Sequence, residues 1–303
     1  MVLFKKKLPL SVMKAILRIR RLENDFPLEE LRDLIKKWRR ASIKFPIAPD
    51  IQIDRLEIEG LETAHIYIKN AQHRGTMLYL HGGGYTFGSI ETHKELVSRL
   101  VRAGNVDAWV MNYRLAPEFP CPAAVEDAIK AYRFLLAKNI DPKNIVIAGD
   151  SAGGGLTISA LVQIREQSLP MPACAFCLSP WADLTNSGES AYINNKVDPM
   201  LTLTMLNRVA RLYVPDGHLD NPLASPLFAD LQGLPPILIQ VGTVEVLLDD
   251  ARRLAEKLEQ AGVNVTLEVW EGMTHVWQVL GELLEEAQYA VEHIATFLDK
   301  HLN

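Results

Sequence analysis

The sequence predicts an α/β protein in which a mostly parallel, eight-stranded sheet is flanked by helices. From residue 50 onward, short apolar runs alternate with longer stretches of helical periodicity. Most of the later runs are continuously apolar, as expected for strands that are buried on both faces. Hydrophobic residues make up 48% of the 303 residues and charged residues 23%, which is ample for a large buried core.

The expected elements follow from these patterns. Two alternating runs favour an antiparallel edge at 51–58 and 65–68. Further strands are expected at 76–80, 108–112, 144–148, 173–178, 236–241 and 265–270. Helices are expected at 94–103, 124–138, 156–167 and 249–261. Strands that alternate with helices in this way give a parallel sheet with helices on both sides.

Two segments depart from the alternation. Residues 1–45 contain two amphipathic helical stretches, the second beginning at Pro27, and their apolar stripes must pack on something. Residues near 185–220 have helical potential but no good strand. We expect this second segment to be an insertion over the carboxyl ends of the strands, where ligands bind in open α/β sheets.

Composition and charge narrow the class of protein. The net charge of −5 argues against a nucleic-acid partner. Residues 1–45 hold 13 Lys and Arg against 5 Asp and Glu, so this arm is either solvated or touches an anionic surface. Lys14 interrupts the first apolar stretch, and no run approaches the roughly 18 residues of a membrane span. Cys121, Cys174 and Cys177 are too few for a disulfide framework. We expect a cytoplasmic protein without stable membrane insertion.

A candidate nucleophile lies in the sequence Gly149-Asp150-Ser151-Ala152-Gly153. This G-x-S-x-G pattern stands between a buried strand and a helix, which is the context in which such a serine is exposed on a sharp turn. A Gly-rich turn with a capping serine would look similar. A phosphate loop is disfavoured because no G-K-[ST] follows.

Candidate oxyanion-hole donors follow the third strand in His81-Gly82-Gly83-Gly84-Tyr85. Glycines let a loop turn its N–H groups toward a developing oxyanion. The predicted donors are the N–H groups of Gly83, Gly84 and Ala152. We expect His81 to fix the loop by hydrogen bonds rather than to act as a base.

The base and the acid are predicted from their order in the chain. The acid and then the histidine follow the serine in α/β-hydrolases. His275 comes just after the last strand in a Gly-containing loop, and Glu245 comes three residues after the strand that ends at Gly242. Asp249 and Asp250 compete with Glu245, but we expect them to cap the next helix and complement its dipole.

The chain resembles the hormone-sensitive-lipase family of bacterial esterases over nearly its whole length. The motifs HGGGY, GDSAGGG, NYRLAPEFPCPAAVED, SPWADLT, ASPL, GLPP, VEVLLDD and GMTHVW occur in the family's order and spacing. The resemblance implies an α/β-hydrolase domain over 46–303. It also implies a helical cap built from 1–45 and the insertion near 185–220. The family's acid is usually Asp, whereas this chain has Glu245. Ion pairs and loop bracing, rather than chemistry, are expected of Tyr113, Arg114 and Asp183.

The resemblance implies a serine carboxylesterase for short- to medium-chain esters, with no cofactor, in a family whose members are frequently dimers. A divalent metal site at Glu245, Asp249 and Asp250 is disfavoured because these residues lack nearby His ligands, so we expect no metal. Tyr85, Phe87 and Trp181 are candidate pocket residues, although they are nearly as well explained as core aromatics. A lactone hydrolase or an acetyl hydrolase of the same fold would carry the same motifs. The sequence is also compatible with a peptide hydrolase, a non-catalytic ligand-binding protein or a membrane-surface interaction protein.

Overall fold

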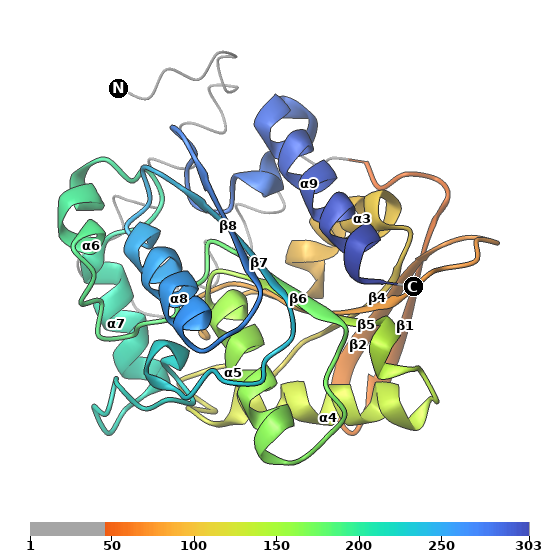
Figure 1. The fold of residues 1–303 in the computed structure, drawn as a ribbon, viewed down its shortest axis with the longest axis horizontal. Coiled ribbons are helices and arrows are strands. Elements are labelled where there is room, and N and C mark those ends of the chain that lie inside the picture. The colour runs from red at the N-terminus through yellow and green to blue at the C-terminus, as the bar shows by residue number, and fades with distance from the viewer. Residues whose placement is uncertain (1–45, 303) are drawn as a thin grey trace.

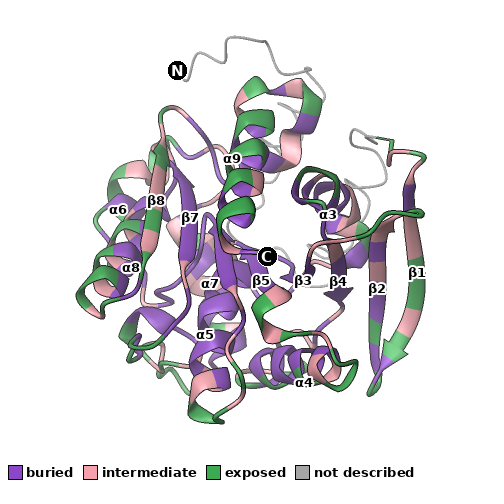
Figure 2. Ribbon diagram, turned by 45° about the vertical axis from the view of Figure 1, so that its right-hand side comes forward, coloured by how far each residue is buried: buried purple, intermediate pink, exposed green. Residues whose placement is uncertain are grey.

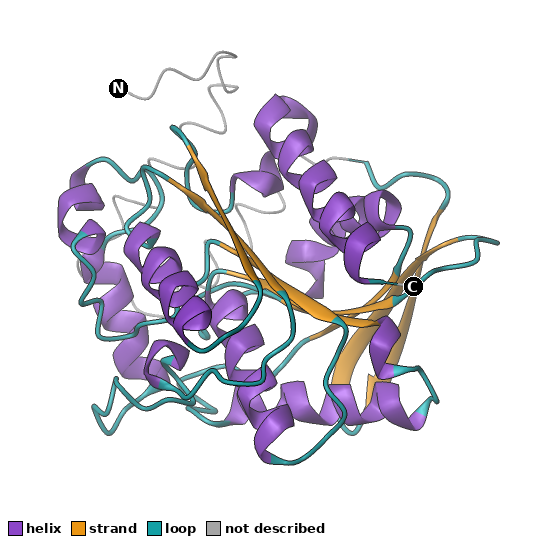
Figure 3. Ribbon diagram, viewed as in Figure 1, coloured by secondary structure: helices purple, strands orange, loops and turns teal. Residues whose placement is uncertain are grey.

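The computed structural model describes residues 46–302, so the helices expected within 1–45 lie outside the described residues. One twisted sheet of eight strands crosses the described part of the chain in the order β1-β2-β4-β3-β5-β6-β7-β8 (Figures 1 and 3). The strands are β1 Ile51–Ile58, β2 Leu61–Ile68, β3 Thr76–Leu80, β4 Asp107–Met111, β5 Ile145–Asp150, β6 Cys174–Leu178, β7 Ile237–Gly242 and β8 Val265–Trp270.

The strand pairing confirms the predicted sheet. β1–β2 and β2–β4 are antiparallel, and every other neighbouring pair is parallel. The β1–β2 hairpin closes through Glu59 and Gly60, which both have positive φ, as a tight two-residue turn requires. This turn pairs Ile58 with Leu61, so β2 begins four residues earlier than the alternation at 65–68 predicted.

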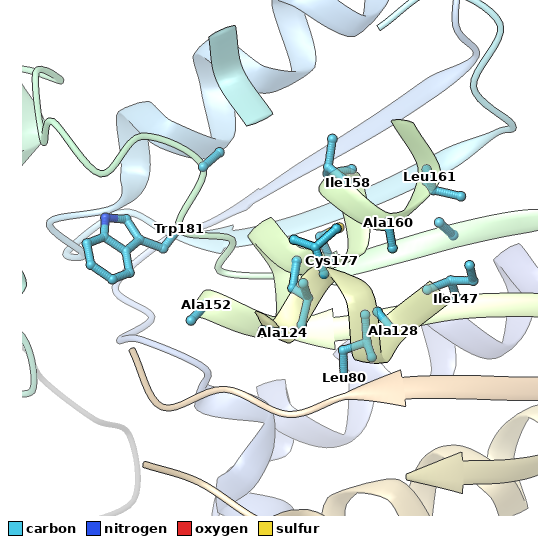
Figure 4. Close-up of a cluster of buried hydrophobic side chains, with 14 of the residues drawn as sticks. Leu80, Ala124, Ala128, Ile147, Ala152, Ile158, Ala160, Leu161, Cys177 and Trp181 are labelled. Carbon is cyan, nitrogen blue, oxygen red and sulfur yellow. The ribbon is translucent and has the colours of Figure 1, made fainter. Parts of the chain in front are cut away.

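Helices cover both faces of the sheet, and the alternation of side chains along β3 separates the two layers. Met77 and Tyr79 pack in a core cluster with residues of α3 (Ile90–Gly104) and α9 (Glu285–His301). Leu78 and Leu80 face a second core cluster with residues of α4 (Ala123–Ala137), α5 (Ala152–Glu166) and α8 (Leu248–Gln260). Figure 2 shows the buried strands between these layers, and Figure 4 draws part of the second cluster.

The segment between β6 and β7 is helical, as expected. It contains α6 (Ser190–Ile193), a 3₁₀ turn at Asn194–Lys196, α7 (Leu203–Tyr213) and a further 3₁₀ turn at Pro226–Phe228. The Thr202 side chain caps α7 by accepting from the N–H of Met205. The buried face of α7 belongs to the same core cluster as α4, α5 and α8, which fixes this insertion on the body of the domain.

The expectations for β8 and α3 were also incomplete. β8 alternates between partly buried and exposed residues and pairs only with β7 among the described residues, so it is an edge strand rather than a buried one. α3 begins at Ile90 instead of residue 94 because Ser89 and Thr92 form a capping box. The remaining 3₁₀ turns are Pro142–Asn144 and Trp277–Leu283.

Candidate active site

Ser151 is the single residue between the end of β5 and the start of α5. Its φ of 54° and ψ of −122° are strained for a residue other than glycine. Backbone hydrogen bonds hold this conformation: the Ser151 N–H donates to Leu178 O over 2.8 Å, and the Ser151 carbonyl accepts from Trp181 N over 2.9 Å. The neighbouring strand β6 therefore helps to fix the turn that carries the predicted nucleophile.

Small residues let the glycine loop after β3 lie directly against this turn. A Cβ on Gly153 would stand 2.0 Å from the Leu80 carbonyl oxygen, so only glycine permits the approach. Asp150 joins the two segments, because its Oδ1 accepts from the Gly82 N–H over 3.0 Å and from the Tyr79 hydroxyl over 2.8 Å. Asp150 therefore braces the serine turn against the glycine loop.

The Asp150 carboxylate is buried beside His93, whose Nε2 lies 3.2 Å from Asp150 Oδ2. Burial alone would raise the pKa of Asp150. The charge and hydrogen bond of His93, with the bonds from Tyr79 and Gly82, outweigh burial and lower the pKa of Asp150 to about 2. Asp150 is therefore a fixed negative charge next to the serine turn.

The glycine loop presents unused backbone donors near the turn. Gly83 has a φ of 127°, and its carbonyl accepts from the N–H groups of Thr86 and Phe87. Within residues 46–302, no hydrogen bond uses the N–H groups of Gly83, Gly84 or Ala152. Three preorganised donors of this kind can hold an oxyanion.

His81 has the structural role expected for it. Its Nδ1 lies 2.9 Å from the Gly82 carbonyl oxygen, and its own carbonyl accepts from the Tyr113 hydroxyl over 2.7 Å. The two rings stack with centroids 4.2 Å apart. Tyr113 therefore braces the glycine loop, also as expected.

Glu245 and His275 meet at the carboxyl ends of β7 and β8. His275 Nδ1 lies 2.8 Å from Glu245 Oε2, and the two side chains are almost completely buried. A carboxylate can only accept, so the proton of this hydrogen bond belongs to Nδ1. The neutral imidazole then has its lone pair on Nε2, the atom that a general base would use.

Ser179 links the acid to the loop that carries the histidine. Its hydroxyl donates to Glu245 Oε1 over 2.8 Å and accepts from the Val276 N–H over 3.1 Å. The Gly242 N–H also donates to Glu245 Oε1 over 2.6 Å. Both oxygens of the carboxylate are therefore engaged, and its orientation toward His275 is fixed.

Three carboxylates set the electrostatics of His275. Burial lowers the pKa of the imidazole, but the hydrogen bond and charge of Glu245, together with the charges of Asp198 and Asp150, raise it above its usual value of 6.5. The site thus favours the protonated imidazole more strongly than water does. A base that must accept a proton during a reaction benefits from this arrangement.

Residues of the insertion bind the loop between β7 and α8 that carries Glu245, here called the acid loop. The sequence patterns did not reveal these residues. The Asn194 amide donates to the carbonyls of Thr243 and Glu245, and the Ser190 hydroxyl donates to the Val246 carbonyl. Asp198 accepts from the Val246 N–H over 3.0 Å. In the sequence, Asp198 precedes a proline inside an irregular segment and has only the pattern of a turn residue.

The predicted pocket aromatics lie in different surroundings. Tyr85 is buried and stacks on Tyr213, with ring centroids 3.8 Å apart and planes within 2°. Trp181 is buried, and its Nε1 donates to Asn186 Oδ1 over 3.0 Å. Phe87 is partly exposed beside the glycine loop. Packing alone accounts for Tyr85 and Trp181, so a pocket role for these three residues stays a prediction.

The carboxylates that compete with Glu245 have other partners. Asp249 and Asp250 lie in the first turn of α8, where they complement its dipole as expected, but contrary to expectation their carboxylates do not cap the helix. Asp249 accepts from the Ser190 N–H, and Asp250 accepts from the N–H groups of Ala182 and Asp183. The first turn of α8 faces the insertion, so the carboxylates bond across to it instead.

The remaining sequence candidates are structural. Arg114 pairs with Asp127, and Asp183 pairs with Arg253, in agreement with the bracing expected of Arg114 and Asp183. The thiols of Cys174 and Cys177 are free and buried, and burial raises the pKa of Cys174 to about 12.

Acidic, histidine and cysteine side chains are too dispersed to form a metal centre in the described residues. Across residues 46–302, no group of three or more of them is placed to hold a metal ion. None of the helices in this part of the chain is long and apolar enough to cross a membrane.

Comparison with known proteins identifies the family. A family model described as alpha/beta hydrolase fold matches residues 77–279. A crystal structure of an esterase from the bacterial hormone-sensitive lipase family is similar, with 42% identity and a TM-score of 0.91. The match covers 98% of this chain and 99% of that one. The chain belongs to the hormone-sensitive-lipase family of α/β-hydrolases.

Two bacterial proteins are also similar to this chain in sequence. An acetyl-hydrolase of Streptomyces hygroscopicus is 45% identical over 77% of this chain and 78% of its own length. An esterase of Acinetobacter venetianus is 36% identical over 95% of this chain and 93% of its own length. The protein is accordingly a carboxylic-ester hydrolase.

Proposed function

We propose that this hydrolase cleaves short- to medium-chain acyl esters through an acyl-enzyme intermediate, with Ser151 as nucleophile, His275 as base and Glu245 as the orienting acid. The observation that carries the proposal is the buried hydrogen bond of 2.8 Å between His275 Nδ1 and Glu245 Oε2. It leaves Nε2 as the basic nitrogen, at the same edge of the sheet as the strained turn of Ser151.

The first half of the reaction forms the acyl-enzyme. Ser151 Oγ attacks the ester carbonyl carbon while its proton passes to His275 Nε2. The carbonyl oxygen becomes an oxyanion and accepts from the N–H groups of Gly83, Gly84 and Ala152. His275 then gives the proton to the leaving alcohol as the bond between the acyl carbon and the alcohol oxygen breaks.

The second half releases the acid. A water molecule loses a proton to His275 as its oxygen attacks the acyl carbon, and the bond from this carbon to Ser151 Oγ then breaks. Ser151 Oγ takes the proton back from His275. Glu245 keeps the imidazole in one tautomer and stabilises the imidazolium in both halves.

Hydrolysis of p-nitrophenyl acyl esters from acetate upward tests the proposal. Activity of the purified protein should fall to background in Ser151→Ala, and the best chain length should identify the acyl group that the site accepts. The similarity to an acetyl-hydrolase favours the shortest acyl group as a second, narrower candidate. Equal activity of the intact protein and Ser151→Ala would contradict the proposal.

Additional substrates distinguish the competing activities. An ester and its matching amide distinguish ester from peptide hydrolysis, and a lactone panel tests for a lactone hydrolase. A folded protein that binds esters without turnover would support a ligand-binding function. A homodimer, a cytoplasmic location and a cap formed by 1–45 with the insertion stay predictions.

A further inference from the structure

We propose that Asp198 is a positioning residue for His275: its buried carboxylate, supplied by the insertion, acts as a second acid that stabilises the protonated imidazole. This inference rests on the proposed function of His275 as the base. It assigns a part in the reaction to the insertion, whose residues Ser190 and Asn194 hold the loop of Glu245.

The first observation is the environment of the Asp198 carboxylate. Its side chain is fully buried. Oδ1 accepts from the N–H groups of Met200 and Leu201 over 2.8 and 3.0 Å, and Oδ2 accepts from the Val246 N–H over 3.0 Å. Burial raises the pKa of the Asp198 carboxyl, and the three N–H donors act against burial by stabilising the ionised form.

The second observation is that this buried charge has no cationic side chain beside it. Among the ion pairs of residues 46–302, none includes Asp198. A buried carboxylate without a cation is costly and is retained where a charge is needed. A positive charge does arise nearby in the proposed reaction, when His275 takes the proton of Ser151.

The third observation is the position of Asp198 relative to the acid and the base. Its Oδ2 binds the residue that directly follows Glu245, so it lies against the acid loop. The two groups also act on each other: the charge of Asp198 raises the pKa of His275, and His275 lowers that of Asp198 against the effect of burial. Burial, the largest influence, leaves the pKa of Asp198 raised, but the effect of each group on the other has the sign of an attractive pair.

The charged groups around His275 come from three elements. Glu245 lies in the loop after β7, Asp150 at the end of β5 and Asp198 in the insertion. Glu245 bonds the imidazole directly, and Asp150 already has His93 at 3.2 Å. Of these three carboxylates, Asp198 is therefore the one whose charge is not paired with another side chain.

A purely structural role for Asp198 predicts different behaviour. Asn194 lies in the same insertion and also holds the acid loop, through its amide bonds to the carbonyls of Thr243 and Glu245, but it carries no charge. If loop holding were the whole role of Asp198, its loss would resemble the loss of Asn194. If its charge acts on His275, only the loss of Asp198 changes the protonation of the base.

The experiment compares the pH dependence of kcat/KM for p-nitrophenyl acetate in the wild type, Asp198→Asn and Asn194→Ala. Asp198→Asn should move the acidic limb of the pH profile, where activity falls as His275 is protonated, about one pH unit lower. It should also reduce kcat on the pH-independent plateau about tenfold. Asn194→Ala should reduce kcat without moving the limb. Glu292→Gln, which removes an exposed carboxylate of α9, should behave as the wild type.

A second readout does not depend on turnover. The imidazole of His275 is titrated by NMR in Ser151→Ala with and without Asp198→Asn, and His275→Gln assigns its signal. A lower pKa of His275 without Asp198 is expected. If Asp198→Asn does not fold, Asp198→Ser keeps an acceptor for the backbone N–H groups and replaces it. An unchanged pKa of His275 together with an unmoved acidic limb would overturn the inference.

Failure of the proposed function gives a different pattern. If Ser151→Ala is as active as the wild type, the proposed triad is wrong, whatever the NMR titration shows. If Ser151→Ala is inactive but neither the limb nor the pKa of His275 responds to Asp198→Asn, the proposed function stands and the role of Asp198 is wrong.

Discussion

Ser179 donates its hydroxyl proton to Glu245 over 2.8 Å, and the same oxygen accepts from the backbone N–H beside His275. One side chain at the end of β6 therefore fixes both Glu245, the proposed acid, and the loop of His275, the proposed base. These three groups come from the ends of three consecutive strands of the sheet, so their alignment is a property of the whole sheet edge.

Ser179→Ala should lower kcat with little change in KM. The variant removes a hydrogen bond to a charged group, worth about 1.5–3 kcal/mol, and frees Glu245 to rotate. We expect kcat to fall about 10- to 100-fold in steady-state ester hydrolysis. Ser159→Ala is the matched control, because within residues 46–302 its buried hydroxyl has no hydrogen-bond partner. Equal losses in the two variants would refute the role of Ser179.

The activity should have an acidic limb centred above pH 6.5. The proposed reaction needs neutral His275, and its pKa is raised in the folded protein, so protonation should remove activity as the pH falls through this raised value. Glu245→Gln should move the limb to lower pH and reduce kcat by about 100-fold or more. Glu245→Asp retains the charge and should keep the limb near its wild-type position. A limb below pH 6 in the wild type would contradict this prediction.

Asp150→Asn should destabilise the fold at neutral pH by about 2 kcal/mol, since one pKa unit corresponds to about 1.4 kcal/mol. The pKa of Asp150 is lowered from 3.8 to about 2 in the folded state. Its contribution is therefore complete above pH 4 and is lost as the pH falls through about 2. Urea unfolding at pH 7 and at pH 3 measures the effect. The difference between variant and wild type should shrink at the lower pH, and a constant difference would indicate a cause other than the charge.

Tyr85→Phe should leave KM and kcat for all chain lengths unchanged. In the described part of the chain the buried hydroxyl of Tyr85 has no hydrogen-bond partner, and the ring stacks on Tyr213. Removing the hydroxyl costs no hydrogen bond, so the melting temperature should stay the same or rise. Tyr85→Ala, which removes the stacked ring, should lower the melting temperature. A selective loss of kcat/KM in Tyr85→Phe would instead place this hydroxyl on the substrate.

The fold could be predicted, and the central residues of the proposed site could be named, because their signals are local. The turn of Ser151 and the glycines of the oxyanion loop are each encoded within a few adjacent residues, and chain order selected His275 and Glu245. The supporting residues have no such signal. Ser179 is 66 residues from Glu245, and Asp198 is 48 residues from Val246, so only the folded chain brings them together.

The same reasoning explains the mistaken details. The strand β8 is an edge because of the sheet order, which its own composition does not encode. Asp249 and Asp250 look like helix caps in the sequence, but tertiary contacts with Ser190 and Ala182 take priority over local capping. Local patterns thus predicted whether a segment is a helix or a strand better than they predicted which other elements it contacts.

The bonds of Ser190 and Asn194 tie the insertion to the loop that carries Glu245, so these two segments must match each other in sequence. In a chimera that receives residues 185–220 from a relative, the new segment must still match the loop that carries Glu245. Recombination between family members should therefore preserve activity when crossover points keep both segments from one parent. Changes of substrate range are more readily acquired through side chains of the insertion that do not contact this loop.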